Sequence, residues 1–263
     1  DTDVDSGDTK AVKDIKAGTA AGAGTAVTAA TTSANGTEVV GSFGTIKIGA
    51  DGSYTYAVDQ ANATVQALNT NSTALSDVFT YTVQDAAGLS STATITVAVT
   101  GANDAATFSG DISKSITETN AAQTVTGTLT VSDVDSSTTV TAQTDVAGSA
   151  GLGKFSITSA GAWTYVMDNA QNQLTAGQQV TDTLTVTAAD GTTQVISVVI
   201  TGTNDAPVAV NDTATSGEAG GTNNGTAGSA LSSTTSGVTA LNVLANDTDV
   251  DSGDTKAVKD IKA

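Results

Sequence analysis

Residues 77–85 read DVFTYTVQD, and the alternation in this stretch decides the fold. In an extended chain, Phe79 and Tyr81 point to one side while Thr80 and Thr82 point to the other. Runs of this kind recur about every ten residues with turn residues between them, which predicts strands joined by hairpins. We therefore expect an all-β fold made of two-sheet sandwich domains.

Aromatic and glycine positions predict the details of these strands. Four aromatic residues alternate with threonine and are expected in the cores: Tyr54, Tyr56, Trp163 and Tyr165. Gly52 and Gly161 lie where hairpin turns are needed, and Asp51-Gly52 is the stronger turn signal. Residues 59–68 are the one weak helical candidate, expected as a short turn.

The sequence repeats itself at two levels. Asp1–Ala17 reads DTDVDSGDTKAVKDIKA, and the same seventeen residues recur as Asp247–Ala263, 246 positions later. A weaker repeat lies inside this period, and each of its two halves closes with Thr-Gly-x-Asn-Asp-Ala. Its aligned stretches are 44–59 with 153–168, 77–85 with 182–190, 94–105 with 195–206, and 1–6 with 131–136.

These repeats predict the domain boundaries. We name the two halves of the period A-type and B-type. Residues 1–104 are expected to form an A-type sandwich that lacks its first strands in the sequence given, and residues 105–206 are expected to form a B-type sandwich. Residues 207–263 form the first part of the next A-type sandwich. Two stretches rich in Gly, Ala, Ser and Thr, residues 18–36 and 216–237, are expected to be an insertion and a loop.

The composition excludes many functions. Twenty-seven acidic residues against nine lysines give a net charge of −18, which makes nucleic acid a poor partner. The chain has no His and no Cys, which excludes Ser–His triads, Cys–His chemistry and most zinc sites, and we expect no enzyme. Without a long apolar stretch, no membrane insertion is expected of this segment. The absence of Cys fits either the cytosol or an extracellular protein that metal ions stabilise.

The ordered motifs resemble a known family. The strings S/T-D-V-D-S, DGSYTY, D-x-F-T-Y-T-V-x-D and T-I-T-V-x-V-T-G-x-N-D-A resemble the VCBS and cadherin-like repeats of large bacterial surface adhesins, among them RTX adhesins. The resemblance implies tandem Ig-like sandwiches in an elongated array, with Ca²⁺ at the domain junctions. It also implies a secreted or cell-surface extender in adhesion and biofilm, with the surface ligand bound elsewhere in the full protein.

The aspartates agree with calcium, which takes six to eight oxygen ligands. Closely spaced Asp side chains can aim two carboxylates at one ion, and Asn-Asp pairs stand between the domains. The candidate ligands are Asp1, Asp3 and Asp5, their copies Asp247, Asp249 and Asp251, then Asp133, Asp135, Asn103, Asp104, Asn204 and Asp205. Asp8 follows close behind the first group. These aspartates do not fit the pattern of an EF-hand loop, because no Glu stands at the twelfth position.

The expected pairing follows from chain order. We expect Asn103/Asp104 to meet Asp133/Asp135, and Asn204/Asp205 to meet Asp247 and Asp249. Secondary candidates at equivalent places are Asp85, Asp190, Asp111, Asp212, Glu118 and Glu218. Asp is also an ordinary turn residue, and for Asp51 and Asp190 we favour that interpretation.

Two other functions stay open. Strands supplied by one copy to another could build an extracellular filament, since a heterologous contact of this kind propagates. Binding of carbohydrate by the sandwich loops is a weaker alternative. The expected partners are therefore neighbouring repeats of the same chain or copies of itself.

Overall fold

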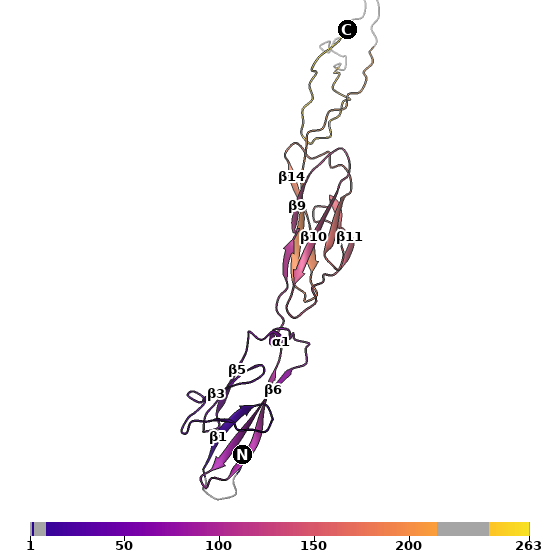
Figure 1. Ribbon diagram of the computed structural model, residues 1–263. Coiled ribbons are helices and arrows are strands. Elements are labelled where there is room, and N and C mark those ends of the chain that lie inside the picture. The colour runs from indigo at the N-terminus through magenta and orange to yellow at the C-terminus, as the bar shows by residue number, and fades with distance from the viewer. Residues whose placement is uncertain (1, 3–8, 215–241, 263) are drawn as a thin grey trace, which may run out of the picture. The chain divides into compact units, whose positions relative to one another are not determined.

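The computed structural model describes residue 2, residues 9–214 and residues 242–262 (Figure 1). Contacts divide the chain into two compact units. One holds Asp1–Phe108, Val131–Thr139 and Ala188–Thr192, and the other holds Ser109–Thr130, Val140–Thr187 and Thr193–Ala263. The described part contains fifteen strands and one helix of four residues, so the all-β prediction is confirmed.

The first set of strands forms two sheets. The larger sheet has the order β2-β1-β6-β7, and the smaller has the order β3-β4-β5. Their bounds are β1 Lys10–Ala17, β2 Thr25–Ala26, β3 Thr37–Val40, β4 Gly44–Ile48, β5 Tyr54–Val58, β6 Leu75–Asp85 and β7 Ser90–Val99. The helix α1, Ala63–Gln66, lies within the predicted 59–68 turn and is capped by the side chain of Asn62.

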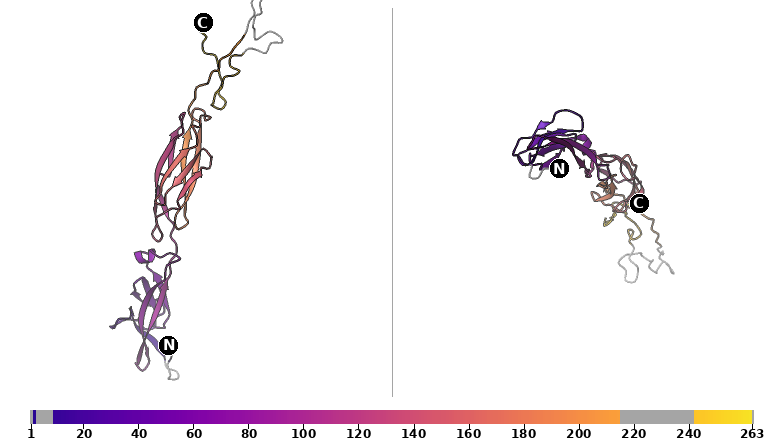
Figure 2. Two further views of the ribbon diagram at one scale, coloured as in Figure 1. Left: turned by 90° about the vertical axis from the view of Figure 1, so that its right-hand side faces the viewer. Right: turned by 90° about the horizontal axis from the view of Figure 1, so that it is seen from below.

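The second set also forms two sheets (Figure 2). One has the order β11-β12-β13-β10-β8, and the other has the order β14-β15-β9, in which β9 runs parallel to β15. Their bounds are β8 Thr107–Gly110, β9 Ser113–Thr117, β10 Thr124–Ser132, β11 Gln143–Ala147, β12 Gly153–Ile157, β13 Ala162–Met167, β14 Gln179–Thr187 and β15 Thr193–Thr201.

The alternation predicted from the sequence produces the cores. Phe79 of β6 is fully buried and packs with Ile15 and Ile46, which joins the two sheets of the first set. In the second set, Trp163 and Tyr165 are buried, and the ring of Tyr165 lies 4.6 Å from that of Phe155 between centroids. The core prediction is confirmed for these two rings. Removing such side chains from water is the main stabilising contribution.

Tyr54 corrects the core prediction. This ring is 50% exposed, although it aligns with Trp163, which is 1% exposed. The physical reason is the position of β5, which lies at the edge of its sheet, whereas β13 is an inner strand. Tyr56, two residues on, is half-buried and packs against the core. The hairpin glycines Gly52 and Gly161 have φ of 82° and 86°, as predicted for turns.

A buried aspartate joins the sheets of the second set. Asp182 of β14 is 0% exposed and accepts three hydrogen bonds, from Ala150 N at 2.7 Å, Leu152 N at 3.1 Å and the Tyr165 hydroxyl at 2.9 Å. Burial and the Asp182 carboxylate raise the pKa of Tyr165, so the phenol keeps its proton and remains a donor. Tyr165 lies on β13, in the other sheet, so this contact ties the two layers together.

The first set repeats this arrangement. Asp77 of β6 is 2% exposed and accepts hydrogen bonds from Ser42 N and Phe43 N, both at 3.0 Å, and from the Tyr56 hydroxyl at 2.8 Å. Burial and Asp77 also raise the pKa of Tyr56. We call these two contacts, Asp182 with Tyr165 and Asp77 with Tyr56, the clamps. The sequence analysis did not predict either of them.

Candidate metal centre

The best candidate site is formed by the linker after β15 and the loop at residues 249–254. The backbone N–H of Asp205 donates to Asp251 Oδ2 at 2.7 Å. The N–H of Asp251 in turn donates to Asp249 Oδ1 at 3.0 Å. Asp205 is 6% exposed and Asp251 is 3% exposed, so two carboxylates are buried next to each other. We call Glu118, Asp205, Asp249, Asp251 and Asp254 the acidic junction.

Glu118 follows β9 and completes this group. Its Oε1 accepts hydrogen bonds from the Thr203 N–H at 2.9 Å and the Thr203 hydroxyl at 2.8 Å, which aligns the linker with the end of β9. Burial raises the pKa of Asp205, and the nearby negative charge of Glu118 raises it further, followed by those of Asp251 and Asp249. Glu118 was only a secondary candidate in the sequence.

Three buried oxygens of the acidic junction lack a partner. Glu118 Oε2, Asp205 Oδ2 and Asp251 Oδ1 are buried and have no hydrogen-bond partner among the described residues. Leaving a buried acceptor unsatisfied costs about 1–3 kcal/mol, and more when it is charged. Bound cations would satisfy such acceptors, and carboxylate oxygens are the ligands that Ca²⁺ prefers. The residues present therefore fit a calcium ion.

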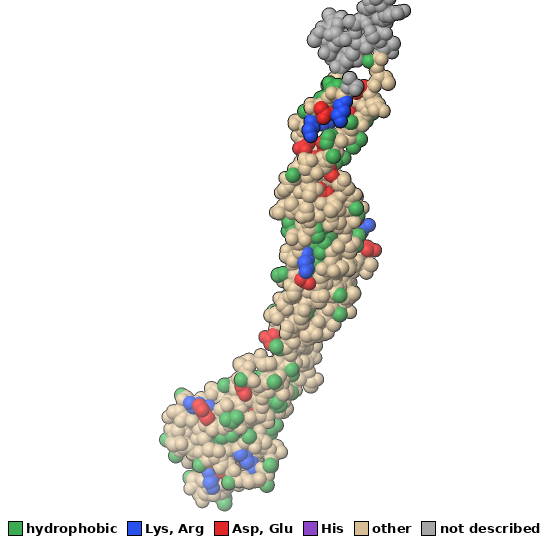
Figure 3. All heavy atoms as spheres, turned by 45° about the horizontal axis from the view of Figure 1, so that its top comes forward, with side chains coloured by type: hydrophobic (Ala, Val, Ile, Leu, Met, Phe, Trp, Pro, Cys, Tyr) green, Lys and Arg blue, Asp and Glu red, His purple; other side chains and the backbone are tan. Residues whose placement is uncertain are grey.

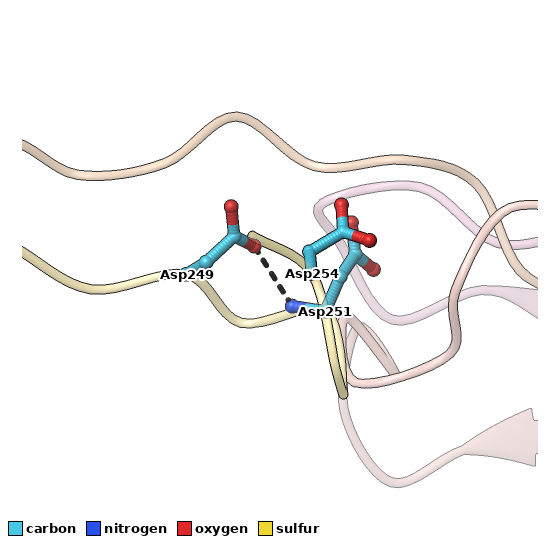
Figure 4. A group of neighbouring side chains, drawn as sticks. All are labelled: Asp249, Asp251 and Asp254. Carbon is cyan, nitrogen blue, oxygen red and sulfur yellow. Dashed lines mark hydrogen bonds between the residues drawn. The ribbon is translucent and has the colours of Figure 1, made fainter. Parts of the chain in front are cut away.

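Asp254 adds a further carboxylate. Oxygen atoms of Asp249, Asp251 and Asp254 lie within 4.8 Å of one another, and Figure 4 shows the three side chains around one bend of the chain. Gly253, with φ of 91°, permits this bend. The signal for Asp254 in the sequence was Asp8, which holds the same place in the first copy of the repeat.

Asp247 and Asn204 are placed differently from the rest. Asp247 Oδ1 accepts a hydrogen bond from Val210 N at 2.8 Å, and its backbone carbonyl accepts one from the Lys256 ammonium. The Asn204 side chain donates to the carbonyl of Asp205 at 2.8 Å. The structure thus brings Asp205 to Asp249 and Asp251, and it directs Asp247 toward residues after the linker.

The linker after β7 repeats the same contacts. Asp104 N donates to Asp135 Oδ2 at 2.9 Å, Asp135 N donates to Asp133 Oδ1 at 2.9 Å, and the Asn103 side chain donates to the Asp104 carbonyl at 3.0 Å. Asp133 Oδ2 is buried without a partner among the described residues. The Asn69 side chain, which the sequence did not indicate, donates to the Asp135 carbonyl at 2.8 Å. Four predicted ligands therefore lie together here.

The other candidates lie elsewhere. Asp111 forms an ion pair with Lys114 at 2.7 Å, and this lysine holds its pKa below the usual range. Asp85 accepts a hydrogen bond from Leu89 N in the β6–β7 turn, and Asp212 is exposed. Asp1, Asp3, Asp5, Asp8 and Glu218 lie outside the described residues.

Turn contacts are found at both aspartates that we interpreted as turn residues. Asp190 accepts hydrogen bonds from the Thr192 hydroxyl and N–H and from Ala106 N, and these contacts lower its pKa to about 2. Asp51 accepts hydrogen bonds from Ser53 N at 3.0 Å and from the Ser53 hydroxyl at 2.7 Å.

Asp51 predicts an acid-dependent loss of stability. The Ser53 hydroxyl, and then its N–H, lowers the pKa of Asp51 below its ordinary value near 3.9. A carboxyl group whose pKa is lower in the folded protein than in the unfolded chain stabilises the fold at pH values above its unfolded pKa. This contribution disappears as the pH falls through the folded pKa. We expect Asp51→Asn to lower the melting temperature at pH 6. The difference from the natural protein should become smaller as the pH is lowered. Thermal unfolding of both proteins in chelator between pH 6 and pH 2 measures this, and parallel curves would contradict it.

The charges outside these sites are sparse. Figure 3 shows a face made largely of uncharged side chains and backbone, with few Asp, Glu or Lys side chains in view. No helix in the described part of the chain is long and apolar enough to cross a membrane.

Comparison with known proteins finds likeness in structure only. No family model and no curated protein matches the sequence. Among solved structures, Drosophila N-cadherin EC1-4 is 12% identical with a TM-score of 0.37, and the match covers 79% of this chain and 45% of that one. The human desmocollin-1 ectodomain is 13% identical with a TM-score of 0.31, covering 62% and 33%.

A third structure comes from a different class of protein. Domains 4 and 5 of the S-layer protein SbsC are 17% identical with a TM-score of 0.25, and the match covers 60% of this chain and 65% of that one. The chain spans less than half the length of the two cadherin-type structures. These TM-scores are too low to indicate a function.

Proposed function

We propose that the chain is a structural extender of a secreted or cell-surface bacterial protein, in which calcium stiffens the joints between sandwich domains. The domains are residues 1–104, 105–206 and 207–263, as the repeats predict. The observation that carries the proposal is the group of three buried, unpartnered carboxylate oxygens at the acidic junction. The same three backbone and side-chain contacts at both linkers support it.

Each residue of the acidic junction has a part in this role. Glu118 comes from the end of β9, Asp205 from the linker, and Asp249, Asp251 and Asp254 from the loop that follows. Calcium held by these residues, with Asp249, Asp251 and Asp254 near enough to share one ion, would link one domain to the start of the next. At the other linker, Asn103, Asp104, Asp133 and Asp135 would serve in the same way, and Asp1, Asp3 and Asp5 would do so for the first copy of the loop.

The chemistry suits a protein that folds outside the cell. Without calcium, the clustered carboxylates repel one another and weaken the folded junction. Calcium affinity at extracellular modules is on the order of 10⁻⁴–10⁻³ M, which suffices outside a cell and not in the cytosol. Such a role needs no catalytic residue, and it agrees with an adhesin of the VCBS and RTX type that serves cell adhesion and biofilm.

A carbohydrate-binding role has less support. The groove over β10, β12 and β13 is lined mainly by Thr, Ser and Gln side chains, and its tryptophan, Trp163, is 1% exposed. Sugars stack on exposed aromatic faces, and this groove offers none among the described residues.

Calcium is expected to raise the melting temperature. A ligand that binds only the folded state stabilises it by RT ln(1 + [L]/Kd), or about 1–2 kcal/mol per site at about 5 mM calcium for the affinities above. Thermal unfolding in calcium and in chelator measures this, with magnesium as a control because it retains its waters. Asp251→Asn should lose much of the rise, whereas Asp59→Asn removes an exposed charge and should keep it. Identical curves in calcium and chelator would remove calcium from the proposal.

A further inference from the structure

Each linker has a glycine that lies against a turn of the chain. Gly101, in the linker after β7, is so close to the turn at Asn69 that a Cβ on this glycine would meet the Asn69 carbonyl oxygen at 2.6 Å. Gly202, in the linker after β15, lies in the same way against the turn at Thr175, whose carbonyl oxygen its Cβ would meet at 2.4 Å. Both glycines belong to the Thr-Gly-x-Asn-Asp-Ala motif. Asn69 and Thr175 therefore hold the same place beside their linkers.

The two turns are also built alike. In the first, Ser72 N donates to Asn69 O at 3.0 Å, and Asn69 N donates to the Ser72 hydroxyl at 3.1 Å. In the second, Gln178 N donates to Thr175 O at 2.9 Å, and Thr175 N donates to Gln178 Oε1 at 3.2 Å. Threonine thus supports the same turn as asparagine, and the two turns differ in what this side chain contacts.

The Asn69 side chain joins its turn to the loop that carries Asp135. Its Oδ1 accepts hydrogen bonds from Asn71 N at 3.0 Å and from the Ser72 hydroxyl at 3.2 Å, which fixes the orientation of the amide. Its Nδ2 donates to the Asp135 carbonyl, and Asp135 Oδ2 accepts from Asp104 N. All of these residues belong to one compact unit. One side chain therefore holds the loop to which the linker after β7 is bonded.

Thr175 makes no such bond in the described part of the chain. Its hydroxyl donates to Gln178 Oε1 at 3.4 Å, inside its own turn, and threonine has no side-chain amide that could donate beyond it. Asp205 N donates to Asp251 Oδ2, as at the other linker. The Asp251 carbonyl, however, accepts from Asp254 N at 3.3 Å, within the same loop, and not from Thr175.

We propose that Asn69 is a latch that keeps the linker after β7 closed without calcium, whereas the linker after β15 has no such latch and depends on its ions. The bond joins an uncharged amide to a backbone carbonyl, so neither a chelator nor the screening of charges by salt removes it. The inference rests on the proposed function, in which it gives the two linkers different parts. In a series of such sandwiches, a fall in calcium would loosen every second linker first.

Hydrogen exchange at single amides tests the latch. The Asp104 amide exchanges when its bond to Asp135 opens, so its exchange rate in chelator, measured by NMR on the whole chain, reports the opening of this linker. Asn69→Thr gives the first turn the side chain of the second. We expect exchange at Asp104 to become about fivefold faster, as for the loss of one neutral hydrogen bond.

Two controls show that the effect comes from the latch. Asn71→Thr makes the same change at an exposed side chain two residues further on, and it should leave the exchange rate of Asp104 unchanged. The Ser72 amide, which is bonded to the Asn69 carbonyl, should exchange equally slowly in the natural chain and in Asn69→Thr. Slow exchange at Ser72 shows that the turn has stayed folded.

The reverse substitution tests the linker after β15. Thr175→Asn places an amide where Asn69 has one, so exchange at Asp205 in chelator should become slower by a similar factor. Thr175→Ser keeps a hydroxyl for Gln178 and should leave the rate unchanged. This arm does not depend on the first turn.

Three results overturn the latch. They are an unchanged exchange rate at Asp104 in Asn69→Thr, an equal increase in Asn71→Thr, and no slowing at Asp205 in Thr175→Asn. Adding about 5 mM calcium to each protein tests the proposed function separately. Calcium that slows exchange at neither Asp104 nor Asp205 would remove the ion from the linkers, while the effect of Asn69→Thr in chelator would still decide the latch.

Discussion

Replacing Asp182 by alanine is expected to lower the free energy of unfolding by about 4 kcal/mol. The carboxylate accepts hydrogen bonds from two backbone N–H groups and the Tyr165 hydroxyl, and it is fully buried. Alanine leaves these three donors inside the protein, and each buried donor without a partner costs about 1–3 kcal/mol. Water can partly enter the cavity that alanine leaves, so the total cost for the three donors should stay below the upper end of this range.

The measurement is unfolding by urea, with two variants for comparison. Tyr165→Phe removes one donor and leaves the carboxylate bonded to the backbone, so it should lose about 1–1.5 kcal/mol. Asp168→Ala deletes an exposed carboxylate of the same sandwich and should change stability by less than about 0.5 kcal/mol. If Asp182→Ala were no more harmful than Asp168→Ala, Asp182 would not be a clamp between the sheets.

The fold was predictable where local alternation decides it. Phe79, Trp163 and Tyr165 are buried because strand residues on one side share a face. Tyr54 was not predictable, because its exposure depends on whether a distant strand pairs with β5. The clamp residues Asp77 and Asp182 are the first residues of the aligned stretches 77–85 and 182–190. The alternation of apolar and polar residues predicts only that an Asp at the start of a strand faces solvent.

The candidate site was predictable in part for a similar reason. The Asp-x-Asp and Asn-Asp patterns are local, and the structure brings Asp205 to Asp249 and Asp251, and Asp104 to Asp133 and Asp135. Glu118 lies in this group only because β9 runs parallel to β15 and meets the linker at Thr203. That pairing joins residues far apart in sequence, and nothing near Glu118 indicates it.

Glu118→Gln is expected to change stability in opposite directions with and without calcium. In chelator, the substitution removes a buried negative charge that interacts unfavourably with Asp205. The protein should therefore gain roughly 1 kcal/mol of stability, and its melting temperature should rise. Gln retains Oε1 as the acceptor for Thr203, so the linker contact is preserved. In about 5 mM calcium, the loss of a charged ligand should lower stability by about 1–2 kcal/mol, because calcium binds more weakly.

This reversal separates a metal site from a merely acidic region. If the carboxylates only kept the chain soluble, Glu118→Gln would shift the melting temperature in the same direction in both buffers. Asp59→Asn makes the same change of charge at an exposed position away from the acidic junction and retains the acceptor for Ala61 N, so it should shift neither curve by much. A Glu118→Gln protein that gains stability in both buffers would contradict calcium binding at this junction. Buried carboxylates that repel one another in one buffer and bind in the other are what couples the folding of the junction to the calcium around it.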